Sequence, residues 1–290
     1  MTADPLDQLV AVLDLEQIEV NLFRGLSPSE PAFRVFGGQV LGQALVAASR
    51  TVEDREAHSL HAYFLRPGDP KIPIIYDVDR IRDGRSFTTR RVNGIQHGKA
   101  IFSMSVSYHI EEAGFEHQNT MPDVPMPEDL QNDEELRKDI LDKIPEKHRG
   151  WFTRERPIEI RPVAPYDPLD PPVRKAAKNV WFKARHALPN DPSIHKCVLA
   201  YASDISLLET SLGPHGLGIL STNVQMASLD HAMWFHRNFK ADEWMLYSQT
   251  SPSSSGARGL NFGEIYTRDG SLIASVTQEG LTRLIDQKDK

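Results

Sequence analysis

One nine-residue stretch gathers several reactive side chains. Residues 228–236 read SLDHAMWFH and hold a serine, an aspartate and two histidines. Such residues serve a metal centre, a nucleophile with its base, or a strand that carries one functional side chain. On a strand, alternation places Ser228 and His231 on opposite faces, and likewise His231 and His236. On a helix the two histidines would lie about 140° apart. Neither geometry predicts a metal site, so the stretch is interpreted as a strand whose functional residue is Ser228.

A second candidate lies on a strand that otherwise faces a core. The hairpin of residues 260–284 turns at Asp269-Gly270, a pair typical of a type I′ turn. Gln278 lies on the apolar face of the returning strand, together with Leu272, Ala274 and Val276. A buried amide without partners costs about 1–3 kcal/mol, so this position indicates a specific role for Gln278.

Composition restricts the class of protein. The chain has 290 residues, 40% of them hydrophobic and 25% charged, which fits one large domain or two of roughly 100–150 residues. A net charge of −7 argues against a nucleic-acid or anionic-membrane partner. The single cysteine, Cys197, excludes a disulfide framework and favours a reduced setting. No apolar run reaches the roughly 18 residues of a membrane span, so no membrane insertion is expected. An acidic N-terminus and a terminal DQKDK favour a cytoplasmic location.

The order of predicted elements repeats along the chain. The first half predicts an apolar helix at 36–50 among strands at 16–24, 58–66, 72–82 and a pair that meets at 96–98. The second half predicts a helix at 194–212 among strands at 156–163, 179–186, 228–236 and 244–251 and the hairpin 260–284. This order predicts an α+β fold of two curled antiparallel sheets, each wrapped around a central helix. The expected units are residues 1–115, an acidic Pro-rich linker at 116–150 with one short helix, and residues 151–290 carrying the catalytic residues.

Comparing the halves separates ordinary from special positions. Superposing the hairpins at Gly98 and Gly270 places Val106 opposite Gln278 without a gap. A polar amide therefore replaces a core residue in the second half.

Two further equivalences depend on how the halves are aligned. Aligning the His-Ala dipeptide of each half places His58 opposite Ser228, and about four extra loop residues place Gly38 opposite Asp204. The competing interpretation is a chance alignment of unrelated surface positions.

Longer stretches resemble the acyl-CoA thioesterase II family of bacteria and peroxisomes over nearly the whole chain. They include FGGQVLGQAL, HSLHAYFLRPGDPKIPIIYDVDRIRDGRSFTTRRV, SLDHAMWFHR, GARGLNFGEIYTRDGSLIAS and TQEGL. The resemblance implies a tandem double hotdog fold and hydrolysis of fatty acyl-CoA to free CoA and a carboxylate, with no cofactor. The family's catalytic Asp, Ser or Thr, and Gln fall on Asp204, Ser228 and Gln278.

These three residue types suit thioester hydrolysis. A carboxylate at Asp204 can take a proton from water, while the Ser228 hydroxyl and the Gln278 amide hold that water in line. Ser228 could instead be a nucleophile, although no G-x-S-x-G elbow exposes it. Substrate-binding candidates are a histidine, a helix-start glycine and three arginines that could meet CoA phosphates, namely His58, Gly38, Arg90, Arg91 and Arg258.

Two other functions are considered. A hotdog enoyl-CoA hydratase needs an Asp and a His about five residues apart, but Glu209 and Gln43 stand five beyond Asp204 and Gly38. A non-catalytic acyl-CoA-binding protein would keep the polar trio for folding specificity alone. The expected partners are acyl-CoA and a further copy of the chain, in a homodimer or homotetramer.

Overall fold

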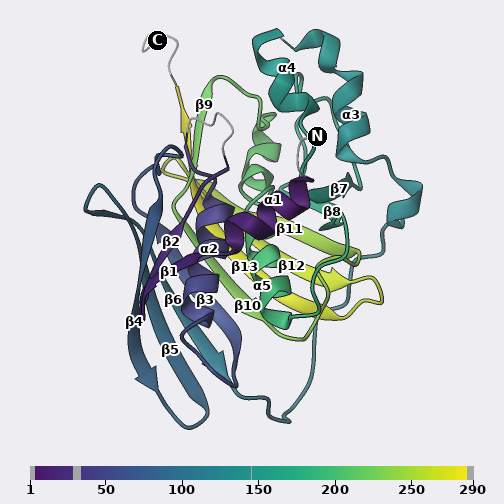
Figure 1. Cartoon of the computed structure of the whole chain (residues 1–290). Coiled ribbons are helices and arrows are strands. Elements are labelled where there is room, and N and C mark those ends of the chain that lie inside the picture. The colour runs from purple at the N-terminus through teal and green to yellow at the C-terminus, as the bar shows by residue number, and fades with distance from the viewer. Residues whose placement is uncertain (1–3, 29–33, 145, 286–290) are drawn as a thin grey trace.

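One antiparallel sheet runs through both halves of the chain. The computed structural model describes residues 4–28, 34–144 and 146–285. The strands of the first half are β1 (Glu16–Glu19), β2 (Leu22–Gly25), β3 (Glu56–Phe64), β4 (Ile74–Asp83), β5 (Phe87–Gln96) and β6 (Lys99–His109). Those of the second half are β7 (Ile158–Pro162), β8 (Ala177–Ala184), β9 (Val224–Ser228), β10 (Asp230–Phe235), β11 (Met245–Ser255), β12 (Arg258–Thr267) and β13 (Leu272–Leu284). Their order is β1-β2-β4-β5-β6-β3-β10-β13-β12-β11-β8-β7, with β9 paired to β13 (Figure 1).

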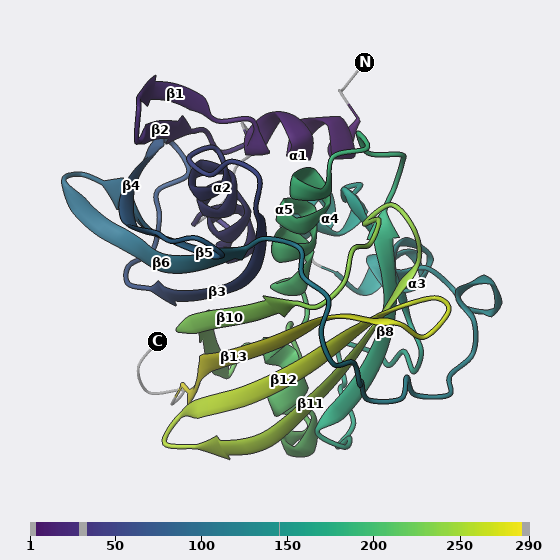
Figure 2. The same cartoon turned by 90° about the horizontal axis from the view of Figure 1, so that it is seen from below.

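The pair formed by β3 and β10 joins the two halves. His231 pairs with Ala62, and Ala232 pairs with His61. On either side of this joint the sheet curls around one helix, α2 (Gly37–Ser49) in the first half and α5 (Pro192–Ser203) in the second (Figure 2). This arrangement confirms the predicted α+β fold with two curled sheets.

The two central helices run antiparallel and touch through small residues. A Cβ added at Gly38 would lie 2.3 Å from the Tyr201 carbonyl oxygen, and one at Gly42 would lie 3.1 Å from that of Cys197. Almost every residue of α2 is buried, as an apolar helix enclosed by a sheet must be. The start of α2 therefore lies beside the end of α5.

The second predicted helix is shorter than expected. It was expected to span 194–212, but α5 ends at Ser203 and a separate 3₁₀ helix, η3 (Leu208–His215), follows. The apolar residues of η3 continue the helical spacing, yet they pack against the sheet: a Cβ at Gly280 would lie 2.3 Å from Leu208. Docking η3 on β12 and β13 requires the chain to turn after α5, and Asp204 is the residue at that turn.

Two local predictions were wrong. The strand expected at 16–24 is the β1–β2 hairpin. At Asp269-Gly270 only the glycine has positive φ (91°), and its N–H donates to Thr267 O, so the turn is centred on Arg268 and Asp269 rather than being of type I′. A two-residue loop with positive φ at both residues occurs instead at His97-Gly98.

The strand expected at 228–236 is interrupted at Leu229. Ser228 pairs with Gly280, whereas Ala232 pairs with Thr277. The distance from Ser228 to Ala232 is four residues, but the matching distance on β13 is only three. One extra residue therefore lies in the β9–β10 edge, which is a β-bulge. β3 has a similar shift against β6 at His58.

The linker is more structured than predicted. It contains η1 (Pro127–Asp129), α3 (Asp133–Asp139), η2 (Leu141–Lys143) and α4 (Glu146–Thr153). Its extended start crosses the outer face of the second sheet, where Gln118 bonds Gly270 O and Leu272 N, and Trp181 Nε1 donates to Pro125 O. The linker thereby covers an outer apolar cluster of Trp181, Leu246, Tyr266 and Leu272.

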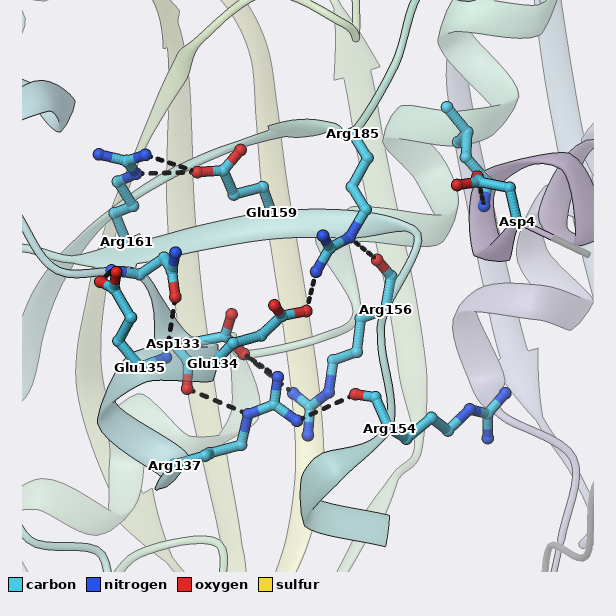
Figure 3. Close-up of polar contacts among 12 residues, drawn as sticks. Asp4, Asp133, Glu134, Glu135, Arg137, Arg154, Arg156, Glu159, Arg161 and Arg185 are labelled. Carbon is cyan, nitrogen blue, oxygen red and sulfur yellow. Dashed lines mark hydrogen bonds and ion pairs between the residues drawn. The ribbon is translucent and has the colours of Figure 1, made fainter. Parts of the chain in front are cut away.

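Charged side chains attach α3 to the edge of the second sheet (Figure 3). Asp133 meets both Arg137 and Arg156, and Glu134 pairs with Arg185 beyond β8. Burial raises the pKa of Asp133 against the effect of these arginines. No apolar side chain of α3 is fully buried, so these charged contacts hold the helix to the sheet.

The remaining helix, α1 (Pro5–Leu13), buries Leu6, Leu9 and Leu13 beside α2. Of the helices in the described ranges, none has the length and apolar character needed to cross a membrane. The DQKDK tail used for the targeting expectation includes residues 286–290, which lie outside the described residues.

The close approach of α2 and α5 leads to a stability prediction. Gly38→Ala is expected to destabilise the fold by about 1–3 kcal/mol, because its Cβ would overlap the Tyr201 carbonyl and the Phe36 ring. Thermal unfolding followed by circular dichroism measures the effect. Gly114→Ala is the matched control, since a Cβ there meets no described atom within 4 Å. Equal melting temperatures for the two variants would contradict the prediction.

Candidate active site

A buried carboxylate lies where the two central helices meet. Asp204 is the C-cap residue of α5, and its side chain is 3% exposed. The start of α2 faces it: a Cβ at Gly37 would lie 2.6 Å from Asp204 Oδ2, and the backbone N–H of Gly38 stabilises the carboxylate. Only glycine lets the helix start come this close. One half of the chain thus supplies the carboxylate and the other half supplies the surface that encloses it.

Two side chains donate to the same oxygen of this carboxylate. Gln278 Nε2 lies 2.6 Å and Ser228 Oγ 3.2 Å from Asp204 Oδ1. Ser228 ends β9, and Gln278 lies within β13, so three separate elements converge. The structure therefore brings together the three residues selected from the sequence as catalytic candidates.

The environment makes Asp204 an unusually basic carboxylate. Burial raises its pKa to about 6, while the hydrogen bonds from Gln278, Ser228 and Gly38 and the charge of Arg34 act in the opposite direction. Its place at a helix C-terminus also disfavours negative charge. Such a group is mostly ionised at neutral pH and still accepts a proton readily, which suits a general base.

His231 approaches the same carboxylate, contrary to the sequence-based expectation. Its Nδ1 lies 3.2 Å from Gln278 Nε2 and 4.0 Å from Asp204 Oδ1. Simple alternation placed His231 and Ser228 on opposite faces, but the bulge at Leu229 adds one residue between them and turns both inward. His236 bonds Ser275 Oγ instead. Within the described ranges no group of three or more His, Cys, Asp and Glu side chains is arranged to hold a metal ion.

The strand registers define which positions of the two halves are equivalent. Val106 pairs with Arg90 in the first half, and Gln278 pairs with Asn261 in the second. The two residues hold the same place in their strands, so the predicted equivalence of Val106 and Gln278 agrees with the structure.

The other two equivalences were wrong. His58 and Leu229 are the extra residues of the two bulges, so Ala57 is the counterpart of Ser228. The C-cap of α2 is Arg50, which is the counterpart of Asp204. Gly38 is the spatial neighbour of Asp204 and not its equivalent, because the two helices run antiparallel. The first half thus carries Arg50, Ala57 and Val106 where the second carries Asp204, Ser228 and Gln278.

The predicted binding residues are scattered. Gly38 lies at the site, whereas His58 bonds Ser107 Oγ at 2.8 Å beside Phe87 and His109, near the opposite end of the helix pair. Arg90 is 2% exposed, and its guanidinium is occupied by Thr51 and Asp83, so it does not face an incoming phosphate.

The two other arginines are exposed. Arg91 pairs with Asp79, away from the helices, and Arg258 pairs with Glu279 close to the end of β9. Of the three arginines proposed for CoA, Arg258 alone lies near the three converging side chains.

The residues considered for the hydratase alternative have structural partners. Glu209 Oε2 accepts from Lys178 Nζ at 2.7 Å, and its other oxygen accepts from Tyr166. Gln43 accepts from Tyr76 and donates to the carbonyl oxygens of Val12 and Leu26. Neither residue faces Asp204 as a hydratase pair would.

Sequence reasoning missed a set of residues around the site. Asn261, directly across from Gln278 on β12, is fully buried, and Tyr247 OH donates to Ser203 O at the end of α5. Arg34 donates to Met226 O on β9, and its positive charge lowers the pKa of Asp204. The buried amide of Gln278 was the available signal for one missed residue, because its partners turn out to be Asp204 and His231.

Comparison with known proteins places this geometry in a family. A family model described as "Acyl-CoA thioesterase" matches residues 147–281, and one described as "Acyl-CoA thioesterase N-terminal domain" matches residues 27–109. The chain is 43% identical to "Acyl-CoA thioesterase 2" of Haemophilus influenzae over 97% of this chain and 99% of that protein. It is 44% identical to human "Acyl-coenzyme A thioesterase 8" over 96% of this chain and 90% of that one.

Solved structures agree. The crystal structure of "Acyl-CoA thioesterase II TesB2" from Mycobacterium marinum superposes with a TM-score of 0.78 at 44% identity, covering 95% of this chain and 98% of that one. A protein with a "Hot dog Fold" from Alicyclobacillus acidocaldarius reaches a TM-score of 0.76 at 18% identity, covering 96% and 99%, which supports the tandem hotdog fold.

Two buried carboxylates on neighbouring segments lead to opposite stability predictions. The pKa of Asp204 is raised to about 6, so its charge costs stability above pH 6, and this cost disappears as the pH falls toward 4. Burial alone would raise the pKa of Glu209, but Lys178 and Tyr166 stabilise its charge and lower the pKa to about 2. The charge of Glu209 therefore adds stability above pH 4.5. Asp204→Asn should stabilise the fold at pH 8 by ~1–3 kcal/mol, and Glu209→Gln should destabilise it.

Denaturant unfolding at pH 8 and pH 5 measures both effects. The gain from Asp204→Asn should shrink at pH 5. A destabilised Asp204→Asn at pH 8 would show that the carboxylate is held mainly for folding.

Proposed function

The chain belongs to the acyl-CoA thioesterase II family and is a thioester hydrolase, and we propose that it cleaves fatty acyl-CoA by direct attack of a water molecule activated by Asp204. The observation that carries the proposal is the convergence of Ser228 and Gln278 on one oxygen of a buried carboxylate with a raised pKa. In this mechanism Asp204 is the general base, and Ser228 and Gln278 orient the water.

The hydrogen-bond directions fit this assignment. The Ser228 hydroxyl and the Gln278 amide nitrogen donate to Asp204, which leaves the Ser228 oxygen and Gln278 Oε1 able to accept. Gln278 Oε1 and Asn261 Oδ1 are buried acceptors with no partner among the described residues. A water that donates one hydrogen to Asp204 and the other to such an acceptor has a fixed line of attack.

The proposed reaction balances as a two-step acyl transfer. Asp204 removes a proton as the water oxygen bonds to the thioester carbonyl carbon, giving a tetrahedral oxyanion. The carbon–sulfur bond then breaks, and Asp204 returns the proton to the CoA thiolate. The start of α2, with Gly37 and Gly38, lies against Asp204, and backbone donors at a helix start stabilise developing negative charge.

A serine nucleophile is the competing route. Ser228 lies 3.2 Å from Asp204, but no described imidazole contacts its hydroxyl: His231 Nδ1 is occupied by Gln278. Serine nucleophiles in hydrolases usually pass their proton to an imidazole, which Ser228 lacks among the described residues, so the arrangement favours water over an acyl-enzyme.

The family also suggests the class of substrate. We propose fatty acyl-CoA as the substrate, with Arg34 and Arg258 as the cations placed to meet the CoA phosphates, since Arg34 contacts β9 and Arg258 begins β12 near the site. A homodimer or homotetramer and a cytoplasmic location stay predictions from the sequence.

Activity of single-site variants tests the assignment. We expect wild type to release thiol from a panel of acyl-CoAs of increasing chain length. Asp204→Asn should lose roughly 10²–10⁴-fold in kcat, since general-base help is removed. Ser228→Ala and Gln278→Leu should lose less, because each removes one contact to the water.

Asp230→Asn is the matched control, because Asp230 accepts from the Glu279 backbone N–H and Asn keeps that acceptor. A loss below about tenfold in Asp204→Asn would contradict the mechanism. A stoichiometric burst of thiol, abolished in Ser228→Ala, would establish the acyl-enzyme route instead.

The raised pKa of Asp204 predicts a pH profile. The kcat/KM of wild type should rise with pH and level off above a midpoint near 6, because the base works only when ionised. Thiol release measured with 4,4′-dithiodipyridine between pH 4.5 and 8.5 gives the profile. A midpoint at the ordinary carboxyl value of about 4 would show that Asp204 is not the titrating base.

A further inference from the structure

We infer that His231 is a positioning residue: together with Ser203 it fixes the direction in which the Gln278 side-chain amide faces. His231 is fully buried on β10 and lies between these two side chains. Its Nε2 lies 2.9 Å from Ser203 Oγ, and its Nδ1 lies 3.2 Å from Gln278 Nε2. The inference rests on the proposed roles of Asp204 and Gln278.

The hydrogen bonds have a definite direction. Ser203 Oγ lies 2.9 Å from Ala200 O, a carbonyl that can only accept, so the serine hydrogen is used there. Toward His231 the serine oxygen must therefore accept, which places the imidazole hydrogen on Nε2. In a neutral imidazole the other nitrogen, Nδ1, is then an acceptor.

Two acceptors now face one end of the Gln278 amide. His231 Nδ1 and Asp204 Oδ1 both need a donor, and the amide NH2 group has the two hydrogens that satisfy them. The reversed amide would direct Oε1 at two acceptors with no hydrogen between them. This series of hydrogen bonds, from Ala200 O through Ser203, His231 and Gln278 to Asp204, thus holds Gln278 Oε1 on the side of the amide away from His231 and Asp204 Oδ1. The proposed water needs an acceptor there.

Neutral His231 is a condition for this series of hydrogen bonds. Burial lowers the pKa of His231 to about 3, so it stays uncharged throughout the range in which Asp204 is ionised. A charged imidazole would donate from both nitrogens and turn the amide around. The groups that face or act on the Asp204 carboxylate are Ser228, Gln278, His231, the Gly38 N–H, Arg34 and Tyr247.

The first half shows what packing alone requires at this position. His231 and Gln278 follow the Ala232–Thr277 pair in the register of β10 and β13. The equivalent pair in the first half is Leu60 with Val106, both fully buried. A leucine therefore fills this place in the fold where no carboxylate needs orienting, and the histidine accompanies the glutamine.

Three variants and one direct measurement test the inference. His231→Leu removes the acceptor, Ser203→Ala removes the group that fixes the tautomer, and His231→Asn keeps an acceptor near the position of Nδ1. His195→Asn is the matched control, because His195 is buried on α5 and accepts from the Ala241 N–H away from Asp204. For each variant, kcat, KM, the pH profile and the melting temperature are measured.

We expect His231→Leu and Ser203→Ala to lose about tenfold or more in kcat with KM little changed, since the Gln278 amide can then turn and its hydrogen bond to the reacting carboxylate is lost. Their acid limb should move up by about one pH unit, because Asp204 loses a donor to its charged form. His231→Asn should recover part of both effects, and His195→Asn should keep the wild-type acid limb. Folded His231→Leu and Ser203→Ala with wild-type acid limbs would overturn the inference.

Nitrogen NMR of wild type labelled with ¹⁵N-histidine reads the tautomer without any change to the fold. We expect His231 to be neutral with hydrogen on Nε2, and hydrogen on Nδ1 would overturn the inference even if the variants do not fold. Asp204→Asn distinguishes the two levels of the proposal. If Asp204→Asn stays active, the proposed mechanism fails; if it is inactive and the His231 and Ser203 variants behave as wild type, the positioning role alone fails.

Discussion

The structure depends on keeping one ionisable carboxylate buried at the end of a helix. Burial and the helix C-terminus both oppose the charge of Asp204, and each donor around it reduces that opposition. The donors come from distant parts of the chain: the start of α2, the end of β9 and the middle of β13. The glycines at the start of α2 let the Gly38 N–H reach this carboxylate, and the bulge at Leu229 lets Ser228 and His231 both face it.

The duplicated fold separates architecture from chemistry. Both halves share the curled sheet, the central helix and a bulge in the equivalent strand. They differ in a few side chains: the first half has Arg50, which faces solvent, and the buried Ala57, Leu60 and Val106, where the second half has Asp204, Ser228, His231 and Gln278. The first half is thus an internal reference for what the fold needs when no carboxylate has to be held, and it shows that the polar residues are not required for packing.

Much of the fold and part of the site could be predicted from the sequence. The alternation of Leu272, Ala274 and Val276 and the apolar helix at 36–50 identified their elements, because each has one dominant period. Gln278 was found because an amide on an apolar face needs an explanation. His231 was missed because a single inserted residue reverses the facing of all that follows it, and periodicity does not reveal where a bulge lies. The end of α5 was missed because η3 continues the apolar spacing while packing on a different surface.

The pairing of β3 with β10 has a consequence for how the site responds to dilution. The carboxylate comes from one half and the enclosing helix start from the other, so a complete site requires both halves together. In an assembly of two separate chains, completeness would depend on protein concentration. Here the linker keeps each half at a high effective concentration relative to the other, so the site is a property of every single molecule.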